Sequence, residues 1–124
     1  MNILITGYDG YIGSVLTPML IQKGYNVSGL DTGFYSSGSL YEESARPSKI
    51  ICKDTRNISK SDLEGVDVVV HLADLSNDPA GELNPDITRD INLRGSVGVA
   101  ELAKESGVKR FIYSSSCSVY GIAN

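Results

Sequence analysis

Short apolar runs alternate with longer stretches of helical periodicity along this chain of 124 residues. The runs predict five strands, at residues 2–5, 25–30, 49–52, 66–72 and 108–114. The fourth run is apolar throughout except for Asp67 and His71, which is typical of a strand covered on both faces. This run therefore indicates a strand in the interior of a sheet.

Two stretches show the spacing of helices. Residues 11–23 place several apolar side chains on one helix face, namely Ile12, Val15, Leu16, Met19 and Leu20. Pro18 lies inside this helix, where it should cost one backbone hydrogen bond and bend the helix, and Gly24 should end it. The second and longer helix is expected over residues 86–106, ending at Gly107.

The connecting segments are polar. Residues 32–48 are expected to be a loop with at most one helical turn, residues 59–63 a helical turn, and residues 75–85 a polar loop. The order of strands and helices predicts an α/β, Rossmann-type three-layer fold, with a parallel sheet of about five strands and helices on both faces. A chain of this length supports one domain.

Composition narrows the possible partners. The net charge of −4 and the sequence pI of about 4.8 argue against nucleic acid, whose binding needs clustered Lys and Arg. No stretch reaches the ~20 apolar residues of a membrane span, and the apolar start lacks the basic residues of a signal peptide. Cys52 and Cys117 lie far apart, without metal-binding spacing. A reduced, cytoplasmic protein without a metal site is therefore expected.

A glycine loop follows the first strand and leads into the first helix. Its glycines are Gly7, Gly10 and Gly13, in the spacing G-x-x-G-x-x-G rather than the dehydrogenase spacing G-x-G-x-x-G. Glycine lets the backbone approach a pyrophosphate, and the helix N-terminus that follows offers unpaired N–H groups and partial positive charge. The loop therefore indicates a nucleotide cofactor; the alternative is a tight turn whose glycines serve packing alone.

Three further side chains could carry function. Asp31 ends the second strand, where a carboxylate accepts hydrogen bonds from the adenosine ribose and repels a 2′-phosphate, so it favours NAD over NADP. Asp54 follows the third strand and could meet the adenine amino group. The alternative for Asp31 and for Asp54 is a solvated carboxylate in a turn or loop. For Asp54, considered without the other motifs, this alternative is the better interpretation. His71, the only histidine, is interpreted as a structural residue rather than a base, since no partner is visible at useful spacing.

Hydroxyl side chains cluster after the fifth strand, in the segment Ser114-Ser115-Ser116-Cys117-Ser118. Open α/β sheets bind ligands at the carboxyl ends of their strands. The cluster is therefore a candidate part of an active site, with a polar turn as the alternative.

Six motifs in register carry a resemblance over the whole chain: the glycine loop after Thr6, Asp31, Asp54-x-Arg56, His71-Leu72-Ala73, Asn92-x-x-Gly95 and the serine cluster with Val119-Tyr120-Gly121. The chain resembles the N-terminal part of extended short-chain dehydrogenases/reductases, and more narrowly the NAD-dependent nucleotide-sugar epimerases and dehydratases. The resemblance implies an NAD(P)-binding Rossmann domain over residues 1–124.

The resemblance also implies roles for particular residues. The glycine loop with Tyr11 and Ile12 would hold the pyrophosphate, Asp31 and Thr32 the ribose, and Asp54 and Thr55 the adenine. Leu72 and Ala73 would line the nicotinamide side, with Asn92 and Ser114 close to the cofactor. Ser116 would be the catalytic residue that bonds the reacting sugar hydroxyl, while hydride passes between sugar C4 and NAD in the complete enzyme. Two carboxylates depart from the family pattern: Asp9 in the loop, and Asp74 where a small residue usually follows His-Leu-Ala.

The family's catalytic base, a Tyr in a Tyr-x-x-x-Lys helix, has no counterpart in this sequence. The sequence thus resembles a truncated cofactor half, expected to bind NAD weakly or not at all and to be inactive alone. A homodimer is expected through the long helix, which carries Ile87, Ile91, Val99, Leu102 and Ala103. A non-catalytic nucleotide-binding module and a sugar-nucleotide reductase remain open alternatives.

Overall fold

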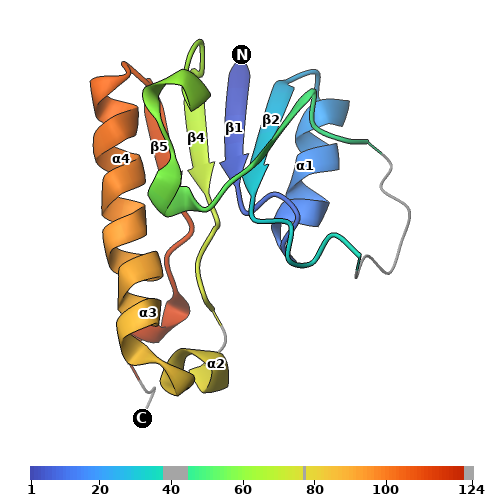
Figure 1. Ribbon diagram of the computed structural model, residues 1–124. Helices are drawn as coiled ribbons and strands as arrows, with labels where there is room; N and C mark the ends of the chain where they lie inside the picture. Colours follow the sequence, from blue (N-terminus) through green and yellow to red (C-terminus); the bar gives the residue numbers. More distant parts are fainter. Residues whose placement is uncertain (38–44, 77, 122–124) are drawn as a thin grey trace.

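A five-stranded parallel sheet forms the centre of the computed structural model, which describes residues 1–37, 45–76 and 78–121 (Figure 1). The strands lie in the order β3-β2-β1-β4-β5, and every neighbouring pair is parallel. Their bounds are β1 Asn2–Thr6, β2 Asn26–Asp31, β3 Lys49–Cys52, β4 Val68–His71 and β5 Arg110–Tyr113. The predicted Rossmann-type parallel sheet is confirmed, with strand ends shifted by at most two residues.

Helices cover both faces of the sheet. Successive strand residues point to opposite faces, so Ile3 and Ile5 of β1 pack under helix α1 (Gly13–Gln22), while Leu4 faces helix α4 (Ser96–Glu105). On the α4 side, Val99 and Ala103 are buried against the sheet. Of the apolar residues named on the long helix, these two therefore belong to the core of the same chain and are not available for contact with a second copy.

Helix α1 differs from the expected helix in its start and in its buried face. Tyr11 and Ile12 lie in the turn before Gly13, and Gly24, with φ of +83°, follows the helix end as expected. The core stripe runs through Gly13, Leu16, Thr17, Leu20 and Ile21. Three side chains of the predicted face are about half exposed, namely Ile12, Val15 and Met19. Apolar spacing alone missed this face because its two fully buried residues, Gly13 and Thr17, are small or polar rather than apolar.

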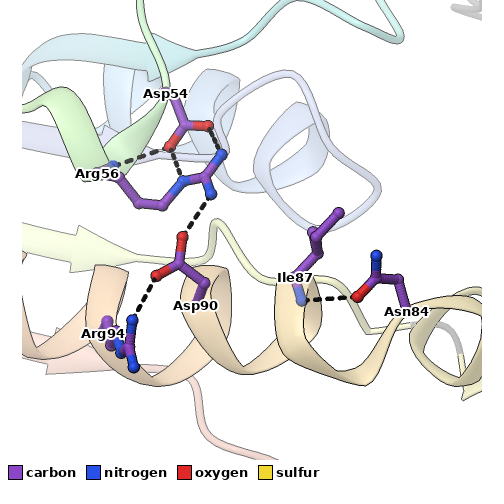
Figure 2. A network of polar contacts seen from close by, with 6 residues as sticks. All are labelled: Asp54, Arg56, Asn84, Ile87, Asp90 and Arg94. Atoms are coloured by element: carbon purple, nitrogen blue, oxygen red, sulfur yellow. Dashed lines mark hydrogen bonds and ion pairs between the residues drawn. The ribbon is translucent and has the colours of Figure 1, made fainter.

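The second helical stretch is continuous but has three parts: α3 (Pro85–Arg89), a π-helical segment η3 (Asp90–Gly95), and α4. Asn84 caps the start, where its side chain accepts the Ile87 N–H at 3.2 Å (Figure 2). The predicted long helix is confirmed in extent. The π segment was not predicted, and such segments often occur where a helix is shaped for function.

The predicted polar loop over residues 75–85 is wrong in part, because helix α2 occupies Asp78–Leu83. This helix is too short to show a period in the sequence, and tertiary contacts support it: the Thr88 hydroxyl donates to the Gly81 carbonyl oxygen at 2.9 Å. The turn expected over 59–63 is the 3-10 helix η2 (Lys60–Asp62), and an unpredicted 3-10 helix η1 covers Thr55–Asn57. Another, η4, covers Cys117–Tyr120.

Part of the loop expected over residues 32–48 lies outside the described residues, which resume at residue 45. Within the described ranges, no helix is long and apolar enough to cross a bilayer.

Candidate functional site

The candidate site lies at the carboxyl edge of the sheet, where β1 and β4 are neighbours (Figure 1). The chain leaves β1 toward β2 on one side and leaves β4 toward β5 on the other. Such a reversal of strand order opens a crevice in which α/β proteins bind ligands. Four segments lie at this edge: the glycine loop after β1, the end of β2, the loop after β4 and the serine segment after β5.

The first glycine of the loop makes the turn. Gly7 has φ of +74°, and its N–H donates to the Leu30 carbonyl oxygen at 2.7 Å. A Cβ on Gly7 would lie 2.9 Å from the Ala73 backbone nitrogen, so the turn fits closely against the loop that leaves β4. Glycine is thus required here both for the backbone conformation and for this approach.

The other two glycines have different surroundings. A Cβ on Gly13 would lie 2.2 Å from the Gly7 carbonyl oxygen, so helix α1 can start this close to the loop only with glycine. A Cβ on Gly10 would approach only the Gly7 carbonyl oxygen, at 3.3 Å, and otherwise face open space. Gly10 is therefore the position at which a phosphate can approach the backbone, as the second glycine does in dinucleotide-binding loops.

Helix α1 begins beside this opening without a side-chain cap. Ile12 is the N-cap residue and makes no capping hydrogen bond through its side chain. Within the first turn, the N–H groups of Ser14 and Val15 donate to the Gly10 and Ile12 carbonyl oxygens, at 2.9 and 3.2 Å. It is therefore chiefly the positive end of the helix dipole that can attract an anion here. The geometry of the loop and helix fits a pyrophosphate.

Asp31, at the end of β2, is held by the backbone around it. Its Oδ1 accepts the Gly33 N–H at 2.9 Å and its Oδ2 accepts the Asp9 N–H at 3.2 Å. Each carboxylate oxygen can accept a further hydrogen bond. The contact with Asp9 connects Asp31 to the glycine loop, so the two features predicted from sequence lie side by side.

The Asp54 carboxylate forms an ion pair with Arg56, as Figure 2 shows. Its carboxylate accepts the Arg56 backbone N–H at 2.9 Å and two guanidinium N–H groups at 3.0 and 2.6 Å. The hydrogen bond from Arg56 lowers the pKa of Asp54, and the contacts with Asp54 and Asp90 raise the pKa of Arg56 above its ordinary value. Arg56 reaches Asp90 of the π segment at 2.6 Å. Arg56 thus connects Asp54 to the π segment η3, a connection that sequence reasoning missed.

Thr55, beside Asp54, has a buried side chain whose Oγ1 lies close to Gly95, where an added Cβ would be 3.6 Å away. Thr32, beside Asp31, is partly exposed, and its carbonyl oxygen accepts the Cys52 thiol at 3.6 Å. Of these two threonines, only Thr32 presents its side chain toward solvent.

His71, at the end of β4, belongs to a polar cluster that the sequence did not reveal. It is fully buried, with Nδ1 2.6 Å from the Thr6 hydroxyl and Nε2 2.9 Å from the Ser96 hydroxyl. Ser96 also donates to Asp74 at 3.3 Å, and the Tyr113 hydroxyl donates to the other oxygen of Asp74 at 2.8 Å. The hydrogen-bonded partners lie between 22 and 65 residues apart along the chain, so only the fold brings them together.

Burial lowers the pKa of His71, and the nearby Asp74 carboxylate offsets this only in part. The histidine is therefore neutral at neutral pH, as suits a structural residue. The hydrogen bond to Asp74 raises the pKa of Tyr113, so that this phenol keeps its proton. A base that removes a proton from a hydroxyl needs the opposite shift.

Asn92 of the π segment holds the loop after Asp74. Its Oδ1 accepts the Leu75 N–H at 2.8 Å and its Nδ2 donates to the Leu75 carbonyl oxygen at 2.9 Å. Asn92 therefore positions the loop that follows Leu72 and Ala73. The Leu72 N–H donates to the Thr6 carbonyl oxygen at 3.0 Å, which extends the pairing of β4 with β1.

The serine segment leaves β5 next to this cluster. The Ser114 N–H donates to the His71 carbonyl oxygen at 3.3 Å. Ser115 has φ of +22°, an uncommon value for a residue with a side chain, and Ser116 is exposed. The segment thus turns sharply at the carboxyl edge, with Ser116 on the surface.

The model of the NAD dependent epimerase/dehydratase family matches residues 3–124. The protein CapI of Staphylococcus aureus is 36% identical over 98% of this chain. A UDP-glucose-4-epimerase from Stenotrophomonas maltophila, solved with bound NAD and formylated UDP-arabinopyranose, has a TM-score of 0.89 at 29% identity over 100% of this chain. TunA, an NAD-dependent NDP-hexosamine 5,6-dehydratase, has a TM-score of 0.88 at 29% identity, also over 100%.

The chain spans about two-fifths of these relatives, namely 39% of CapI, 39% of the epimerase and 40% of TunA. The parallel sheet, the glycine loop and the family match over residues 3–124 agree with one another. The chain belongs to the NAD dependent epimerase/dehydratase family, whose cofactor is NAD.

Proposed function

We propose that this chain is the cofactor-binding part of an NAD-dependent nucleotide-sugar epimerase or dehydratase. The observation that supports it most is the pairing of the open glycine loop with Asp31, whose carboxylate is held against the loop by the Asp9 N–H at 3.2 Å. Residues 1–124 would then form one NAD-binding domain.

In this proposal the backbone around Gly10, Tyr11 and Ile12 binds the pyrophosphate, and Asp31 binds the adenosine ribose. Asp54, with lone pairs left beside Arg56, accepts the adenine amino group. Leu72, Ala73 and Ser114 lie on the nicotinamide side, and Ser116 bonds the reacting sugar hydroxyl. NAD, when bound, supplies a hydride acceptor for sugar C4 in the complete enzyme. This chain's residues orient the two reactants.

Tyr113 does not serve as the base in this scheme, since its hydrogen bond to Asp74 raises its pKa. The homodimer also stays a proposal. It would use apolar side chains that the long helical stretch leaves about half exposed, namely Ile87, Leu93 and Val97, instead of the buried Val99 and Ala103. A nucleotide-sugar substrate and a cytoplasmic location are proposed on the same family basis.

The test is a titration of the purified chain with NAD and with NADP at concentrations up to the millimolar range, followed by ligand-observed NMR. We expect NAD to bind about tenfold more tightly than NADP, since Asp31 accepts ribose hydroxyls and repels a 2′-phosphate. Asp31→Asn should abolish this preference. Glu105→Gln, an equal change of charge at a distant exposed pair with Lys60, should preserve it. Equal or tighter binding of NADP to the unmodified chain would refute the role of Asp31. Of the two expectations from sequence, weak binding or none, we propose weak binding, because the glycine loop and Asp31 lie together in the folded chain. No NAD binding up to the millimolar range would therefore refute the proposal that residues 1–124 form an NAD-binding domain.

A further inference from the structure

The His71 cluster consists of Thr6, His71, Asp74, Ser96 and Tyr113, and its hydrogen bonds lead to the Asp74 carboxylate as the final acceptor. Because the Ser96 hydroxyl donates to Asp74, its oxygen is free to accept the His71 Nε2–H, and the neutral ring then accepts the Thr6 hydroxyl at Nδ1. Tyr113 donates to Asp74 from the other side. The carboxylate thus accepts directly from Ser96 of α4 and Tyr113 of β5. It also ends the chain of hydrogen bonds that begins at Thr6 of β1 and passes through His71 of β4.

No ion pair with a Lys or Arg is recorded for Asp74 within residues 1–37, 45–76 and 78–121. Its partners are the hydroxyls of Ser96 and Tyr113, and the His71 Nε2 lies 4.0 Å away. The Asp74 side chain is 22% exposed, so its negative charge is only partly screened by water. A cation placed at this edge of the sheet would be stabilised.

The position of Asp74 relative to the dinucleotide follows from the fold. Asp31 marks the adenosine side, at the end of β2, and the pyrophosphate lies at the glycine loop after β1. The other half of the ligand must then extend across the reversal of strand order, over the ends of β4 and β5. Ala73 touches the glycine loop, where a Cβ on Gly7 would lie 2.9 Å from its nitrogen, and Asp74 is the next residue.

We propose that Asp74 makes this site selective for the oxidised cofactor, because its carboxylate stabilises the cationic nicotinamide ring of NAD⁺ relative to the neutral ring of NADH. This inference rests on the proposed function. It gives a role to a residue that departs from the family's usual small side chain. A site of this kind binds NAD⁺ more tightly than NADH, so its resting form is the one that accepts a hydride from the sugar.

The test measures dissociation constants of NADH, from its fluorescence, and of NAD⁺, by competition, on the full chain at low salt. The ratio of the NADH constant to the NAD⁺ constant should fall about tenfold in Asp74→Asn, as expected for loss of a partly solvated charge near a cation. Asp74→Glu, which keeps the charge, should retain most of the ratio.

Two matched variants separate charge from structure. Glu105→Gln makes the same change of net charge at the far end of α4 and should leave the ratio unchanged. Tyr113→Phe removes one hydrogen bond to Asp74 but keeps the carboxylate, so the ratio should again persist. If Asp74→Asn fails to fold, as judged by circular dichroism, Asp74→Ala is measured in its place.

An unchanged ratio in the folded Asp74 variant would overturn the inference while leaving NAD binding, and so the proposed function, intact. Equal loss of ratio in Glu105→Gln would also overturn it, because the effect would then be one of net charge. If neither NAD⁺ nor NADH binds the unmodified chain, the proposed function fails and this inference fails with it.

Discussion

His71 makes the stability of the fold depend on pH in a predictable direction. Its side chain is fully buried between the hydroxyls of Thr6 and Ser96, and burial lowers its pKa in the folded chain. The unfolded chain, with a histidine pKa near 6.5, therefore binds the proton more readily than the folded chain does. The stabilisation from keeping His71 neutral is fully present above the unfolded pKa and is lost as pH falls below it.

The size of the effect follows from proton linkage. For a site protonated in the unfolded chain alone, the free energy of unfolding changes by about 1.4 kcal/mol per pH unit. From about pH 7.5 to about pH 5.5 the loss should thus approach about 1.4 kcal/mol, reduced by the attraction of Asp74 at 4.0 Å. His71 is the only histidine in the 124 residues, which makes this pH window specific to it.

The measurement is urea unfolding of the unmodified chain and of His71→Gln at several pH values across that window. Glutamine can donate to Ser96 but does not titrate, so the variant should lose stability at every pH while its pH slope becomes flat. A flat profile in the unmodified chain, or an equal slope in His71→Gln, would refute the assignment of a neutral buried histidine.

Two further predictions concern the glycine loop and the loop after β4. Gly13→Ala should lower the free energy of unfolding by about 1–3 kcal/mol and weaken NAD binding at least about tenfold, since its Cβ would lie 2.2 Å from the Gly7 carbonyl oxygen. The control is Gly98→Ala in helix α4, where an added Cβ meets nothing within 4 Å, and it should raise the free energy of unfolding by about 1 kcal/mol. A loss of stability in Gly98→Ala as large as that in Gly13→Ala would contradict the packing argument. Asn92→Ala should speed hydrogen exchange at the Leu75 amide and cost about 1 kcal/mol, whereas Asn92→Asp, which keeps the acceptor, should exchange more slowly than the alanine variant.

Local pattern was sufficient where one signal dominates a segment. The apolar run of residues 49–52 has the same bounds as β3, and the positive φ of Gly24 follows the helix end that its sequence position suggested. Local pattern was insufficient where contacts between distant residues determine the structure. Helix α2 is supported by a hydrogen bond from Thr88, and helix α1 buries Gly13 and Thr17 while Val15 and Met19 remain half exposed.

The sequence by itself determined the parallel α/β fold, the glycine loop and the carboxylate at the end of β2, because each depends on residues that are adjacent or evenly spaced along the chain. Only the tertiary structure decided the partners of His71, Asp74 and Tyr113, which come from different strands and meet at one edge of the sheet. Sequence spacing carries no information on such meetings, since strand order and helix packing determine them. The preference proposed for NAD⁺ over NADH could therefore be inferred only from the tertiary structure.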